Sequence, residues 1–278
     1  MRAGASNQQE MQPRTGLWQP AQPAFWLLAV ITLAALPLLG LSLIGMGADW
    51  GIWAVALIGC ALQTLLLLWI AHLVSGVRGR PRRQLRSLRL GALLAGAVAA
   101  PGFAVVVNSL YGEFLGAYGL NRLSAAISAP ITEDAVRMVC LILILALAAT
   151  RRLTILDGVV YGFLVGAGFE LMENVLYVLR GDDLGAAMQS VVVRMLMGFG
   201  LHALWTAVAG GALAYIWSRA QAGMPTRWWI LIPAYVLPML LHVGWDAPGL
   251  SVITFLKFVE WFLLYLVTVG AFIGGVWW

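Results

Sequence analysis

Charged residues are scarce in this sequence. Only 10% of its 278 residues are Asp, Glu, Lys or Arg, whereas about 25% is usual in soluble globular domains. Hydrophobic residues make up 62% of the chain, and the mean hydropathy is +0.89. These proportions exclude an ordinary soluble domain and predict an integral membrane protein.

Cysteine is also scarce. The chain has only two, Cys60 and Cys140, and each lies within a different apolar run. The sequence therefore predicts neither a disulfide framework nor a cysteine-rich metal site. Residues 1–23 are polar and rich in Gln and Pro, and they lack a short apolar core followed by a cleavage site. We expect them to form a disordered cytoplasmic tail and not a signal peptide.

Long apolar runs are what the sequence has in quantity. A helix needs about 20 mostly apolar residues to span a bilayer, and no loop is long enough to form a soluble domain. We predict an all-α, polytopic membrane protein in which residues 24–278 form one membrane-embedded domain. Its eight predicted transmembrane helices lie at roughly 24–46, 51–75, 90–110, 129–149, 153–179, 191–216, 228–246 and 251–277.

Arginine is concentrated in the loop between the second and third predicted spans. Loops rich in Lys and Arg stay in the cytoplasm, so we expect both termini to be cytoplasmic in a multi-pass protein of the cell membrane. This topology already explains the basic loop, so we do not predict binding to nucleic acid. The predicted partner of the apolar spans is the lipid bilayer. The residues are Arg78, Arg80, Arg82, Arg83, Arg86 and Arg89.

Ionisable residues inside the predicted spans are the strongest functional signal. Each costs about 2.5–3.5 kcal/mol on insertion scales, so each is a candidate functional residue. With the predicted orientation, four successive spans bring such groups to the outer half of the bilayer, where we expect one polar pocket that opens outward. They are Glu133, Asp134 and Arg137, then Glu170 and Glu173 with the uncharged amide of Asn174 beside them, then Arg194 and His202, then His242 and Asp246.

Four short motifs in these spans resemble the PrsW family of intramembrane proteases, distant relatives of the CAAX-prenyl endopeptidases. The family pattern is E-E-x-x-K, then F-x-x-x-E, then a histidine in the next span, then H-x-x-x-D. Within residues 129–246 this chain reads E-D-A-V-R from Glu133, F-E-L-M-E up to Glu173, H-A-L-W-T from His202 and H-V-G-W-D up to Asp246.

The chain departs from the family pattern at two positions. Asp134 stands in place of the second glutamate, and Arg137 in place of the lysine. Arginine does not exchange its proton, so Arg137 would orient or neutralise its neighbours. The resemblance implies a peptidase that cuts a membrane-tethered, single-span protein near the outer face. By that resemblance, an anti-sigma factor is one such substrate.

The residues allow two versions of peptide hydrolysis, and the first uses a metal. Zinc takes imidazole and carboxylate ligands and leaves one position open for water. His202, His242 and Glu173 would be the ligands, Glu133 the general base, and Asp246 would fix the tautomer of His242. The H-E-x-x-H signature of soluble zinc peptidases is absent, so tertiary packing would have to build this site.

The second version uses no metal. Glu133 would take a proton from water, Glu173 or His202 would orient that water, and His242 would donate to the oxyanion. The usual description of the family as metalloproteases favours the metal version. In either version, Arg137, Asn174 and Arg194 would orient the site, and its candidate catalytic residues are Glu133, Asp134, Glu173, His202, His242 and Asp246.

Two other functions are consistent with buried carboxylates and histidines. A proton-coupled transporter uses such groups as a relay, but we expect it to show inverted repeats and broken helices, and neither is apparent in the sequence. An inactive scaffold that binds single-span partners would lack a site residue, whereas the acids and histidines are present here.

Overall fold

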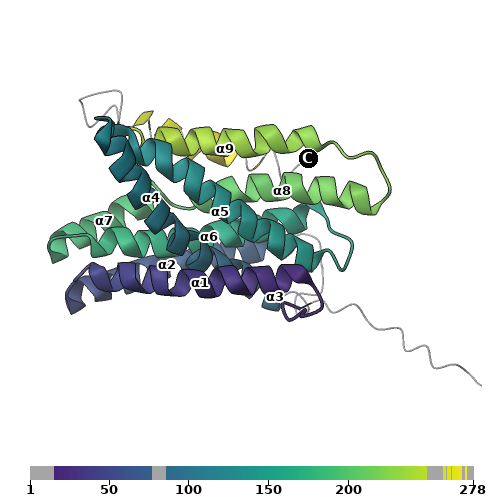
Figure 1. Ribbon diagram of the computed structural model, residues 1–278, viewed down its shortest axis with the longest axis horizontal. Helices are drawn as coiled ribbons and strands as arrows, with labels where there is room; N and C mark the ends of the chain where they lie inside the picture. The colour runs from purple at the N-terminus through teal and green to yellow at the C-terminus, as the bar shows by residue number, and fades with distance from the viewer. Residues whose placement is uncertain are drawn as a thin grey trace, which may run out of the picture.

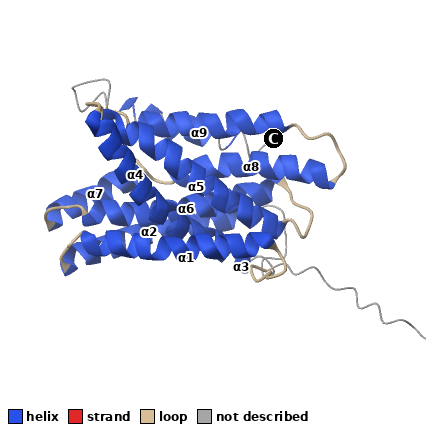
Figure 2. Ribbon diagram, in the orientation of Figure 1, coloured by secondary structure: helices blue, strands red, loops and turns tan. Residues whose placement is uncertain are grey.

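The computed structural model describes residues 16–76 and 86–248, together with residues 259–260, 262–263, 265–270 and 273. Every regular element in these ranges is a helix (Figure 2). The π-helix Ala95–Ala99 joins α3 to α4, so that the two form one long segment. The α-helices are α1 (Pro23–Gly45), α2 (Trp50–Gly76), α3 (Arg86–Leu94), α4 (Ala100–Ala117), α5 (Ser124–Ala148), α6 (Ile155–Leu179), α7 (Leu184–Leu196), α8 (Leu201–Gln221) and α9 (Leu231–Asp246).

Six helical segments of the described ranges are long and apolar enough to cross a membrane, which confirms a polytopic membrane protein. They match the first, second, third, fifth, sixth and seventh predicted spans. The fourth, 129–149, falls on α5. That helix is 25 residues long, but it carries three charged residues, Glu133, Asp134 and Arg137, and is not among the six apolar segments. Most of the eighth, 251–277, lies outside the described residues.

Part of the predicted N-terminal tail, residues 1–15, also lies outside the described residues. The residues that follow contact the helices. Gln19 is buried, and its Nε2 donates to the carbonyl oxygen of Leu147 at 3.0 Å. The backbone N–H of Leu17 donates to Ser87 Oγ at 3.1 Å. The chain is therefore fastened to the ends of α3 and α5 before α1 begins.

Helix α6 lies at the centre of the bundle, between α8 and α2 (Figure 1). Glycine lets it approach α8 closely. A Cβ on Gly162 would lie 2.3 Å from the carbonyl oxygen of Thr206, and one on Gly166 would lie 2.1 Å from that of His202. Such distances are closer than any non-bonded contact, so glycine is required here. In a membrane, where the hydrophobic effect does not join helices, this close packing of small residues does so.

The sixth predicted span, 191–216, is not one helix. Helix α7 ends at Leu196 and α8 begins at Leu201, with four non-helical residues between them. Gly200, the N-cap of α8, has φ of 75°, a left-handed conformation that glycine adopts without strain. Gly198 adds a second residue of low helix propensity. The break turns the chain just before His202, the second residue of α8.

Candidate active site

Arg137 of α5 is the fully buried centre of the candidate site, with 1% of its surface exposed. It forms an ion pair with Asp134 on its own helix. Its Nη1 lies 2.6 Å from Nδ1 of His202 on α8, and its guanidinium lies 4.7 Å from the ring centre of Phe169 on α6. One side chain thus joins three helices.

His202 is held between two charged groups. Its Nε2 lies 3.0 Å from Glu173 Oε2. Because arginine only donates hydrogen bonds, Nδ1 beside Arg137 must accept. A neutral imidazole then carries its proton on Nε2, facing the Glu173 carboxylate. The ring is also packed at 5.0 Å between ring centres against Phe169, Trp205 and His242.

His242 of α9 lies among three carboxylates from two helices. Its Nε2 is 3.3 Å from Asp246 Oδ2 and 3.6 Å from Glu133 Oε2, while its Nδ1 is 3.5 Å from Asp134 Oδ2. Only 1% of the residue is exposed. The sequence predicts that Asp246 fixes the orientation of His242; in the structure Asp134, on α5, contacts the other ring nitrogen.

Glu133 of α5 points into a cavity, and its two oxygens differ in environment. Oε1 accepts a hydrogen bond from Asn108 Nδ2 at 2.9 Å, and Asn108 is in turn an acceptor for the hydroxyl of Thr132. Oε2 is buried and has no hydrogen-bond partner among the described residues. A buried carboxylate oxygen without a partner is costly unless a ligand or water satisfies it, so this atom is the best-placed one for chemistry.

Glu173 and Asn174 of α6 are both bound by Arg194 of α7. The guanidinium pairs with the Glu173 carboxylate through Nη2 and donates to Asn174 Oδ1 through Nε. It also lies 4.3 Å from the ring centre of Tyr177, one turn further along α6. Arg194 was predicted to orient the site, and these contacts show which groups it touches.

Glu170 of α6 lies one turn before Glu173 and does not line the cavity. Its Oε1 accepts from Gln63 Nε2 and from the backbone N–H of Gly200, both at 2.7 Å. Asn174 Nδ2 donates to Gln63 Oε1 at 3.0 Å. Glu170 therefore ties the break before α8 to α6 and α2, one turn from Glu173. This fixes the position at which His202 enters the site.

The sequence reasoning missed Gln63 and Asn108. Each is a lone amide in an otherwise apolar stretch, LIGCALQTLLLL and FAVVVNSL. An uncharged polar residue in a predicted span was the available signal, but no spacing connected either residue to the four motifs. Their importance is visible only because the fold places them against Glu170 and Glu133.

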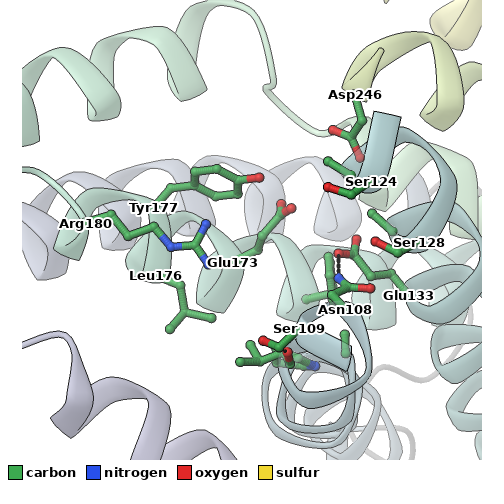
Figure 3. Close-up of a pocket in the computed structure, with 16 residues that line it drawn as sticks. Asn108, Ser109, Ser124, Ser128, Glu133, Glu173, Leu176, Tyr177, Arg180 and Asp246 are labelled. Carbon is green, nitrogen blue, oxygen red and sulfur yellow. Dashed lines mark hydrogen bonds between the residues drawn. The ribbon is translucent and has the colours of Figure 1, made fainter. Parts of the chain in front are cut away.

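The cavity in front of Glu133 has a volume of about 240 Å³ (Figure 3). Its walls are α4, the first turns of α5 and the last turns of α6, with Asp246 at the end of α9. Glu133 and Glu173 point into it from α5 and α6 (Figure 3). Three of the predicted site carboxylates thus share one cavity, beside the two histidines.

Three residues of the site are of the types that bind metal ions. Glu133, His202 and His242 can each bring one ligand atom to within 4.8 Å of the others, and all three are buried. Two imidazoles and a carboxylate are a ligand set typical of catalytic zinc. The carboxylate differs from the one that the sequence predicts, because Glu173 is already paired with Arg194. A histidine ligand stays neutral, so a metal on Nε2 of His202 would require the ring proton on Nδ1, and the contact with Arg137 would have to change.

Comparison with known proteins agrees with this geometry. A model of the PrsW family intramembrane metalloproteases matches residues 84–274, more than half of the chain. Two similar relatives are each named Protease PrsW. The one from Geobacillus kaustophilus (strain HTA426) is 29% identical over 32% of this chain and 36% of its own length. The one from Bacillus subtilis (strain 168) is 32% identical over 38% of this chain and 48% of its own length.

The chain thus spans less than half the length of the curated relatives that it matches. No solved structure matches it significantly. The family match covers α3 to α9, and these include all the helices that supply the carboxylates, histidines and arginines of the site. The chain therefore belongs to the PrsW family of intramembrane metalloproteases.

Proposed function

We propose that this protein is an intramembrane endopeptidase that hydrolyses a peptide bond of a membrane-tethered protein near the outer face of the bilayer. One observation carries the proposal. Side chains from α5, α6, α8 and α9 converge beside one cavity, and they include two carboxylates that line it, Glu133 and Glu173, next to two histidines, His202 and His242. Hydrolysis needs groups that move protons between water, carbonyl and leaving amine, and these are such groups.

Glu133 is the proposed general base. Glu133 lines the cavity, its Oε2 has no hydrogen-bond partner among the described residues, and its Oε1 is held by Asn108. A carboxylate so placed takes a proton from a water molecule as that water attacks the carbonyl carbon. His242 Nε2, at 3.6 Å, is the nearest ring nitrogen to Glu133 Oε2. It is placed to stabilise the oxyanion and to return a proton to the leaving amine.

Glu173 and His202 form the second half of the proposed site. Arg194 holds the Glu173 carboxylate from the side of α7, so that its Oε2 meets the Nε2 of His202 at 3.0 Å. Arg137 fixes the opposite edge of the same ring. The pair therefore offers a rigid wall against which a water molecule or a substrate carbonyl is oriented, and such orientation lowers the barrier of the reaction.

The family description as metalloproteases implies a metal. In this chain Glu133, His202 and His242 would hold it. Bound there, a metal would polarise the carbonyl and activate water. Glu173 would then remain outside the ligand set and would act as the proton acceptor next to His202. The metal-free version uses the same residues with Glu133 as the base, and a metal count separates the two.

The proposed substrate is a single-span membrane protein, with an anti-sigma factor as the class implied by the resemblance. Most of the helices around the site are long and apolar enough to span a membrane, which supports access by a membrane-tethered chain. In the proposed orientation both termini are cytoplasmic, and so is the arginine-rich loop between α2 and α3. The chain then runs outward through α3 and α4, which puts the cavity beside α4 in the outer half of the bilayer.

The break between α7 and α8 is a feature that transporters also show. Here, however, the N–H at the break is bound to Glu170, and the N-terminal end of α8 carries His202 against Glu173. The interruption thus positions a site residue. The peptidase remains the function that the geometry supports best.

Cleavage of reporters tests the proposal. The purified protein would be reconstituted in vesicles with single-span reporter proteins, and the products would be mapped by mass spectrometry. We expect Glu133→Gln and Glu173→Gln to lower the cleavage rate by about 100-fold or more, as for the loss of a general base. The matched control is Glu113→Gln, an exposed glutamate of α4. Full activity of Glu133→Gln would remove that residue from the mechanism.

A further inference from the structure

A second cavity lies next to the first, and it carries an inference that rests on the proposed peptidase function. We propose that the substrate crosses the site as an extended segment running from one cavity into the other. The smaller cavity admits only small side chains on one side of the cleaved bond, and the larger accepts bulky side chains on the other side.

The two cavities meet at three residues. The smaller, of about 240 Å³, lies between α4, α5 and α6. The larger, of about 530 Å³, lies between α7 and the end of α9. Ala125, Tyr177 and Asp246 line both. The two cavities thus adjoin beside the site, because Asp246 lines both and contacts His242, which in turn lies beside Glu133.

The cleaved bond has to lie near this junction. Glu133 and Glu173 line the smaller cavity, and Arg194, the partner of Glu173, lines the larger. A peptide bond at the junction is the one that places its carbonyl carbon within reach of both carboxylates. The residues before and after that bond then lie in different cavities.

The bound segment has to be extended. In a helix each carbonyl oxygen accepts a hydrogen bond from the N–H four residues on, which protects it from attack. Once the segment is extended, its backbone N–H and C=O groups need new hydrogen-bond partners from the protein, because the bilayer core contains no water to supply them. Both cavities offer short polar side chains for this purpose: Asn108, Ser109, Ser124 and Ser128 in the smaller one, and Gln189 and Ser190 in the larger one.

Cavity size sets the side-chain preference. The smaller cavity has less than half the volume of the larger. The backbone of the bound segment takes up part of that volume, which leaves room for small side chains. The smaller one is closed by buried Phe169 and Leu176 of α6, whose positions are fixed by packing. Tyr177 separates the two cavities, and its ring is held between Arg194 at 4.3 Å and Arg180 at 5.1 Å.

A substitution scan of a cleaved reporter tests the preference. The reporter is a single-span protein that the wild type cuts at a mapped bond. The three residues on each side of that bond would be changed one at a time to Ala, Leu or Trp. We expect Trp next to the bond to lower cleavage about tenfold or more on one side and only slightly on the other, since pocket size discriminates side chains by such factors.

Two variants assign the sides. Leu176→Ala enlarges the smaller cavity and should restore cleavage of the disfavoured Trp reporter relative to the Ala reporter. Val193→Ala, a similar truncation in the larger cavity, should leave that ratio as it is in the wild type. Ser190 is a half-buried residue of α7 that lines the larger cavity. Ser190→Leu narrows that cavity and should make the tolerant side of the bond selective. It tests the same asymmetry without touching the core.

The outcomes separate this inference from the proposed function. Cleavage with equal tolerance on both sides would overturn the inference and leave the peptidase function intact. So would an unchanged preference in both Leu176→Ala and Ser190→Leu, provided that these variants still cut the Ala reporter. If the wild type cuts no reporter in the whole set, both the proposed function and the inference fail.

Discussion

Arg194 of α7 pairs with the carboxylate of Glu173 on α6, and the same guanidinium donates to the neighbouring Asn174. The contact spans the gap between a short helix and the central helix of the bundle. Arg194 lies two residues before the end of α7, so its contact joins the last turn of that helix to α6. The carboxylate that it holds is the one that faces His202.

The first prediction concerns that side chain. Arg194→Lys keeps the charge but loses the planar fork that reaches Glu173 and Asn174 together. We expect the cleavage rate to fall by roughly 100-fold, because a small displacement of a positioned group has effects of that size. Reporter cleavage would be measured beside Arg122→Lys, at an exposed position before α5. Equal activity of the two variants would show that Arg194 is needed only for its charge.

The second prediction concerns metal content. The protein purified without chelator should contain about one zinc per chain, because two histidines and a carboxylate are a ligand set typical of catalytic zinc. His242→Ala should lose it, whereas Glu173→Gln should keep it, because Glu133 and not Glu173 lies with the two histidines. Elemental analysis measures the count. A well-folded wild type without metal would favour the version in which Glu133 activates water alone.

The third prediction concerns the polar network under the site. Gln63→Leu removes the donor to Glu170 and the acceptor for Asn174. Each buried group left without its partner costs about 1–3 kcal/mol, so the variant should unfold at a clearly lower temperature. Gln189→Leu, on the exposed face of α7, is the control. Unchanged melting of Gln63→Leu in detergent would contradict the assigned network.

The fourth prediction concerns the contact between α6 and α8. Gly166→Ala would place a methyl group 2.1 Å from the carbonyl oxygen of His202, so the helices must separate. We expect loss of folded protein, or loss of activity in what remains folded. In α1, by contrast, a Cβ on Gly40 meets nothing within 4 Å. Gly40→Ala should be neutral or stabilise the helix by up to about 1 kcal/mol. Thermal melting and folded yield distinguish the two, and similar behaviour would refute the close approach.

The sequence predicted the site because charge in a membrane span is rare. Glu133, Glu173, His202, His242 and Asp246 stand out against apolar neighbours, and the structure brings all five together. The roles were harder to predict. Whether Glu133 or Glu173 joins the histidines depends on which carboxylate Arg194 neutralises, and that pairing joins residues 21 positions apart on different helices.

By itself, the sequence determined that this is an all-helical membrane protein with one polar site, because composition and the length of apolar runs are local properties of the chain. Only the tertiary structure decided the break between α7 and α8, the supporting roles of Gln63 and Asn108, and the two cavities that meet at Tyr177. These features arise where helices distant in sequence pack together, and the spacing of residues along one helix does not encode which neighbour they meet.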